Sequence, residues 1–139
     1  MVSICLEYVS ERANKIYIYC SHEEGFISND FFYDINGHIL ERHKLNDVLS
    51  DGEEKFLYDT SVERQKAVVR IINDDIKEMI KLCKKYDREM PTEIKIIYDV
   101  QANKIVANYK YDLIHTNDPN NTAGSVAKNW LEKVRAESA

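Results

Sequence analysis

Alternating apolar and polar positions mark the first half of the chain. In NKIYIYC, residues 14–20, isoleucine and cysteine alternate with tyrosine, and this period of two predicts a strand. Two further alternating stretches, FISNDFFYDI and HILERHKL, are joined by Asn36-Gly37, a pair that tolerates positive φ and favours a tight hairpin. These patterns predict a three-stranded antiparallel meander over about residues 15–45.

A period of three to four residues replaces the alternation after residue 60. Thr60 precedes Glu63 by three positions, the spacing of a capping box at a helix start, and Pro91 stops any continuation. We therefore predict one long amphipathic helix in this region. The first dozen residues suit a helix or a strand, and we expect a helix. The apolar stripe of the long helix comprises Val69, Ile72, Ile76, Met79, Ile80, Cys83 and Tyr86.

Residues 92–112, TEIKIIYDVQANKIVANYKYD, predict a second hairpin with its turn at residues 101–103. One face of it is apolar, and the other carries Glu93, Lys95 and Asp99, as expected where one side of an antiparallel sheet meets water. The tyrosines of the chain are also expected to fall into a buried group and an exposed group. We expect Tyr98, Tyr109 and Tyr111 in the core, and Tyr17, Tyr19 and Tyr58 open to solvent. SVAKNWLEKVRAE predicts a last helix.

Length and composition define the domain organisation and the fold class. A chain of 139 residues with 44% hydrophobic content forms a single domain, residues 1–139. We predict an α+β, two-layer domain with a mainly antiparallel sheet of about five strands, made of the meander and the C-terminal hairpin, packed against helices. No apolar run approaches the roughly 20 residues that span a bilayer, and the N-terminus lacks the basic start of a signal peptide. We expect a cytoplasmic protein without a membrane partner.

The residue types that carry chemistry are sparse. The three cysteines form no CxxC pair and the four histidines lack zinc-site spacing, so we expect buried thiols, no metal and no cofactor. The net charge of −5 argues against direct binding of nucleic acid. One enzymatic alternative is a metal-dependent nuclease that uses Glu93, Lys95 and Asp99. Glu and Lys alternate on many solvated strands, however, so we expect no enzyme.

The order of elements resembles the YezG-like family of bacterial immunity proteins. In the first half the resemblance lies in NKIYIY, EEG and FFYDI. In the second half it lies in the long charged helix, in Pro91 leading into TEIKIIYDV, and in KIVANYKYD. The chain departs from the family in a shorter N-terminal helix and in lacking a Trp near the first strand or after Pro91. The resemblance implies a cytoplasmic, non-catalytic antitoxin that neutralises a toxin of bacterial competition, such as contact-dependent growth inhibition.

An acidic domain of this kind suits a basic nuclease toxin, because opposed potentials speed encounter and set specificity. We expect the chain to act as a monomer in the complex; a non-catalytic adaptor is the remaining alternative. The loop before the long helix and the outer face of the second hairpin compete as docking sites. We favour the loop, since loops vary easily on a fixed scaffold. The expected toxin-binding residues are Asp47, Asp51, Glu53, Glu54, Tyr58 and Asp59, with Glu23 and Glu24 in the first turn.

Overall fold

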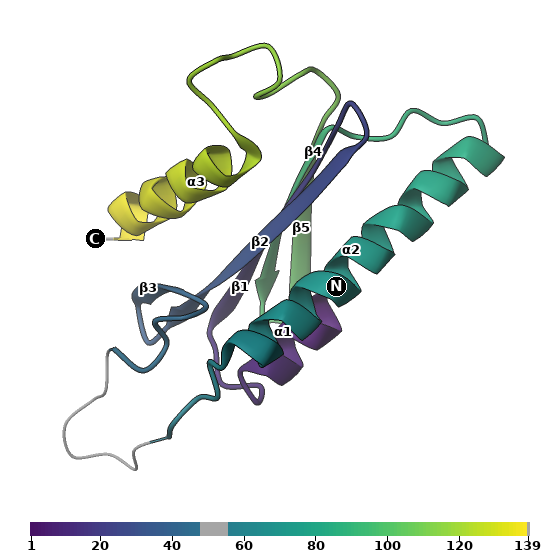
Figure 1. The fold of residues 1–139 in the computed structure, drawn as a ribbon. Helices are drawn as coiled ribbons and strands as arrows, with labels where there is room; N and C mark the ends of the chain where they lie inside the picture. Colours follow the sequence, from purple (N-terminus) through teal and green to yellow (C-terminus); the bar gives the residue numbers. More distant parts are fainter. Residues whose placement is uncertain (48–55, 139) are drawn as a thin grey trace.

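The computed structural model describes residues 1–47 and 56–138. Its centre is a five-stranded antiparallel sheet in the order β3-β2-β1-β4-β5, with helices on both faces (Figure 1). The expected α+β class and the five strands are confirmed, and antiparallel pairing of β1 with β4 joins the meander to the second hairpin. The elements are α1 (Val2–Tyr8), β1 (Lys15–Glu23), β2 (Phe26–Ile35), β3 (His38–Glu41), α2 (Val62–Lys85), β4 (Glu93–Asp99), β5 (Lys104–Lys110) and α3 (Ala123–Ser138).

The two faces of β1 are buried against different helices. Ile16, Ile18 and Cys20 belong to the larger core, which α1 and α2 cover, and the expected N-terminal helix is confirmed as α1. Tyr17 and Tyr19 point to the opposite face, where they pack with α3. Both tyrosines are buried, so the expectation that they are exposed is wrong. The reason is that β1 is the central strand and has a helix on each side.

The N-cap of the long helix α2 lies one residue later than predicted. Ser61 is the N-cap, and its hydroxyl accepts a hydrogen bond from the Arg64 amide at 3.4 Å, so the predicted capping box of Thr60 and Glu63 is not formed. Three side chains of the helix are fully buried: Val68, Ile72 and Ile76. The stripe weakens toward the C-terminal end, and Tyr86, just beyond the helix, is 62% exposed. The first half of α2 therefore supplies most of its packing.

The Asn36-Gly37 turn has the predicted hairpin geometry, since both residues have positive φ.

On the sheet face opposite α1 and α2, α3 packs through Trp130. The Trp130 ring lies edge-on to the rings of Tyr17 and Phe32, with centroids 5.7 and 5.1 Å away. Among the described residues, no helix is long and apolar enough to cross a membrane.

The edge strand β5 lies outside the main helix contacts, which involve β1, β2 and β3. Tyr109 and Tyr111 are therefore about half exposed, and the prediction that they belong to the core is wrong. Tyr98, on the neighbouring strand β4, is partly buried against the larger core, as expected of it. Side chains that share a face of the hairpin thus meet different surroundings, because only the inner strand approaches the helices.

Candidate functional site

The acidic loop before α2 is only partly within the described residues, because Asp51, Glu53 and Glu54 lie in the segment 48–55 outside them. Its flanks are well defined. Asn46 binds the backbone N–H and C=O of Tyr58 through its side chain at 2.8 and 2.9 Å, which holds the two ends of the loop together. Tyr58 is half-buried and donates its hydroxyl to the Arg12 carbonyl, while Asp47 and Asp59 are exposed. Hydrogen bonds from Ser61 hold the pKa of Asp59 below its usual range.

The two other acidic residues of the predicted surface lie elsewhere. Glu24 is exposed in the β1–β2 turn, which lies at the end of the sheet opposite the start of α2 (Figure 1). Glu23 is only 1% exposed, so the prediction that it contacts a partner is wrong. The predicted residues that the structure describes do not form one continuous acidic surface.

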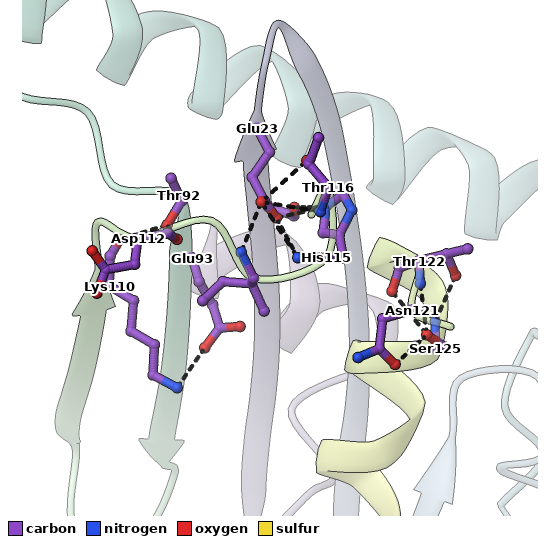
Figure 2. A network of polar contacts seen from close by, with 12 residues as sticks. Glu23, Thr92, Glu93, Lys110, Asp112, His115, Thr116, Asn121, Thr122 and Ser125 are labelled. Carbon is purple, nitrogen blue, oxygen red and sulfur yellow. Dashed lines mark hydrogen bonds and ion pairs between the residues drawn. The ribbon is translucent and has the colours of Figure 1, made fainter. Parts of the chain in front are cut away.

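Glu23 holds the loop that follows β5 (Figure 2). Its Oε1 accepts hydrogen bonds from the Ile114 amide at 2.8 Å and from the Thr116 hydroxyl at 3.2 Å, and its Oε2 lies 2.7 Å from Nε2 of His115. Burial alone raises the pKa of this carboxyl. The backbone hydrogen bonds and the His115 ring outweigh burial, so the pKa of Glu23 is lowered. This carboxylate therefore fastens the 111–122 segment to β1.

Ser21, His115 and Glu23 invite comparison with a catalytic triad, but their geometry differs from one. The Ser21 hydroxyl lies 3.3 Å from Nε2 of His115, the same nitrogen that contacts Glu23. A triad needs the two ring nitrogens in separate roles, one taking the proton of the nucleophile and the other held by the carboxylate. The arrangement therefore ties a loop to the sheet and does not activate the serine.

Glu93 is the centre of a second buried polar cluster. Its side chain is on the α3 face, where Tyr19 donates a hydrogen bond to Oε2 at 2.9 Å. Two ammonium groups approach Oε1, that of Lys95 at 3.6 Å and that of Lys110 at 3.8 Å. Glu93 is only 2% exposed, so the prediction that it lies on a solvated face is wrong. The cause is the central position of β1, whose Tyr19 covers the carboxylate.

The geometry of β4 separates the residues of the nuclease alternative. Glu93 and Asp99 lie at opposite ends of the strand, six residues or about 20 Å apart. Asp99 accepts a hydrogen bond from the Ala102 amide in the turn. These two carboxylates cannot share a metal ion. Elsewhere in the part of the chain that the structure describes, no group of three His, Cys, Asp or Glu side chains is placed to hold one.

Among the described residues the outer edge of β5 is unpaired, and the strand exposes several apolar side chains. Ile105 is 59% exposed and Tyr109 is 52% exposed on the face shared with α1 and α2, and Val106 is 56% exposed on the α3 face. Lys104 and Lys110 stand at the two ends of the strand. The alternation of the sequence showed which of these residues share a face, but it did not reveal that β5 is an edge strand. The apolar Val106 on the otherwise polar side was the available signal.

Comparison with known proteins gives no assignment, since no family model matches the chain and no curated protein matches it. The resemblance to YezG-like immunity proteins stays a prediction from the sequence.

Proposed function

We propose that this chain is an immunity protein that binds a cognate toxin, a nuclease, in the cytoplasm and neutralises it by covering its active or substrate-binding surface. The observation that supports this function best is the uncovered β5 strand. Exposed apolar residues on both faces of an edge strand are unusual on a monomer surface, because edge strands are normally short, bulged or covered. A partner that covers Ile105, Val106 and Tyr109 gives these side chains a purpose.

The exposed side chains of β5 would contribute to specific binding. Burying a fully exposed Ile or Val side chain contributes roughly 1.5–3 kcal/mol, so removing the remaining exposed half of each contributes about 1 kcal/mol. Tyr109 adds a rigid ring with a polar tip, the kind of residue enriched in interface cores. These contributions add to the backbone contacts, and together they must outweigh the freedom that two molecules lose when they associate.

The buried carboxylates also fit a binding role. Glu23 is engaged with His115 and Glu93 with Tyr19, so both carboxylates shape the hairpin and its following loop. Inhibition of a nuclease requires only that the inhibitor exclude the nucleic acid. The net charge of −5 would aid encounter with a basic toxin, and the exposed Asp47 and Asp59 can make a second contact.

The test is protection of cells from the toxin domain encoded directly upstream, together with the affinity of the purified pair. Tyr109→Ser should weaken the complex and reduce protection. Tyr86→Ser is the matched control, because Tyr86 is 62% exposed and is the C-cap of α2, so it lies outside the sheet. Circular dichroism should show that both variants keep the native fold.

Three results would contradict the proposal. One is that the upstream domain is not toxic, or is not bound by this chain. Another is that Tyr109→Ser and Tyr86→Ser reduce affinity equally. The third is that the purified chain alone cuts nucleic acid in the presence of magnesium and that Lys95→Ala removes this activity.

A further inference from the structure

We infer that the partner docks by strand addition: an extended segment with acidic residues six positions apart pairs with the free edge of β5. The inference rests on the proposed function for the identity of the partner only. The strand-accepting edge itself follows from the backbone and side chains of β5.

The first step concerns which backbone groups of β5 face outward. His22 N–H bonds Thr92 C=O, and Val100 N–H bonds Asn14 C=O, so the even-numbered residues of β4 bond to β1. The odd-numbered residues of β4 must then bond to β5, and their partners there are even-numbered. The N–H and C=O groups of Ile105, Ala107 and Tyr109 therefore point away from the sheet. In the described chain, no other segment forms backbone hydrogen bonds with these outward groups.

The second step concerns the side chains that a new strand would meet. On the face of α1 and α2 it would lie beside Ile105 and Tyr109, which favour apolar partners. On the α3 face it would lie beside Lys104 and Lys110, with Val106 and Asn108 between them. Lys110 is well exposed despite its 3.8 Å approach to Glu93, and lysines are the only charged residues of β5. Acidic residues opposite both lysines complete this pattern, since opposite charges across strands stabilise pairing.

The same two lysines disfavour a second copy of this chain as the occupant. Antiparallel self-pairing that uses all of β5 would be centred on Ala107. It would place Lys104 directly opposite Lys110 of the other copy, twice, and like charges in that position destabilise a sheet. Lysines on an edge strand commonly have this effect. The edge is thus closed to its own copy and open to an acidic strand.

The other edge of the sheet is less accessible. β3 pairs with β2 from Phe32 to Ile35. Just before that stretch, the Asp30 carboxylate accepts a hydrogen bond from the Phe31 amide at 2.8 Å and binds Arg42 at the same distance. These contacts occupy the Phe31 amide next to β3, and Arg135 donates a hydrogen bond to the outward Ile39 carbonyl of β3 at 3.0 Å. This edge is therefore partly occupied by the chain's own side chains, and β5 offers the better site.

The test uses fluorescein-labelled peptides that match the seven residues of β5 in length. EVTVTVE carries glutamates six positions apart, and its symmetric sequence serves either strand direction. KVTVTVK is the charge control. We expect the purified chain to bind EVTVTVE about five- to thirty-fold more tightly than KVTVTVK in fluorescence anisotropy. The Lys104→Glu/Lys110→Glu double variant should reverse this order of affinities.

Backbone pairing is tested from both sides. Ala107→Pro removes an outward N–H from an edge strand and should abolish binding. EVTVTVE with N-methyl groups on alternate residues tests the same bonds without altering the protein, and two versions cover both edges of the peptide. At least one version should lose binding.

Binding of EVTVTVE and KVTVTVK with equal affinity, no binding of EVTVTVE, or full binding of both N-methylated versions would each overturn strand addition. The toxin assay separates this inference from the proposed function. A chain that binds EVTVTVE but gives no protection retains the strand-accepting edge and is not an immunity protein. A chain that protects but ignores the peptide docks by another surface.

Discussion

Replacement of Glu23 by glutamine tests whether one buried carboxylate holds the 111–122 segment on the sheet. The substitution keeps the size of the side chain and removes its charge. It also turns one acceptor oxygen into an NH₂ group, which must face either the Ile114 amide and the Thr116 hydroxyl or the His115 ring. In the first orientation the hydrogen bond from the Ile114 amide is lost. In the second, the contact with His115 becomes at best a neutral hydrogen bond in place of a charge-assisted one.

The magnitude follows from the contacts. A hydrogen bond to a charged group contributes about 1.5–3 kcal/mol. The side-chain oxygen that glutamine retains still accepts some of the hydrogen bonds that the carboxylate accepted. Local opening of the segment that leaves the sheet folded would limit the effect on global stability. We expect Glu23→Gln to lower the free energy of unfolding by about 2 kcal/mol at pH 7.

The pH dependence has a definite sign. Because the pKa of Glu23 is lowered in the folded protein, the carboxyl stabilises the fold at pH values above its unfolded pKa of about 4.3. This stabilisation is lost as the pH falls through the lower, folded-state pKa. The difference in stability between the wild-type chain and Glu23→Gln should therefore be largest near neutral pH and should shrink below about pH 4.

The assay is urea unfolding at several pH values, followed by hydrogen exchange of the amides of residues 114–116. Glu24→Gln is the matched control, since Glu24 is the next residue along the chain and is exposed. It should change stability by less than about 0.5 kcal/mol. Equal effects of the two variants, or unchanged exchange at Ile114 in Glu23→Gln, would refute the role of this carboxylate.

Two further variants test the other buried contacts. Tyr19→Phe removes the only hydrogen bond that the Glu93 carboxylate accepts among the described residues and should cost about 1.5–3 kcal/mol in urea unfolding. A change below about 0.5 kcal/mol would show that the two nearby lysines, Lys95 and Lys110, satisfy this carboxylate without Tyr19. Ser61→Ala removes the observed helix cap and should cost about 1 kcal/mol in thermal unfolding, whereas Thr60→Ala should have little effect; the reverse order would restore the predicted capping box.

The strands and helices were predictable because their signals are local. The alternation in NKIYIYC and the Asn36-Gly37 turn require only neighbouring residues, and so does the apolar stripe around Ile72 and Ile76. The helix cap was missed by one position, since Thr60 and Ser61 both carry a hydroxyl and the choice between them depends on the path of the chain before the helix.

The order of the strands was not predictable in this way. Alternation identifies residues that share a face, but it does not say whether a helix covers that face. Tyr17 and Tyr109 each begin a Tyr-x-Tyr alternation. Tyr17 is buried in the central strand, whereas Tyr109 is half exposed on the edge strand. The burial of Glu93 depends on Tyr19, 74 positions away in the chain. Such contacts follow only from the assembled sheet.

The charge of the whole chain is a poor guide to its docking surface for the same reason. The net charge of −5 directed attention to acidic side chains, yet Glu23 and Glu93 are buried. The β1–β2 turn that carries Glu24 lies at the end of the sheet opposite the start of α2 (Figure 1). β5 is the reverse case, with lysines as its only charged residues in an acidic protein. Long-range steering responds to the net charge, whereas the choice of a paired strand responds to the side chains directly opposite. A partner that is basic overall and acidic along one extended segment satisfies both.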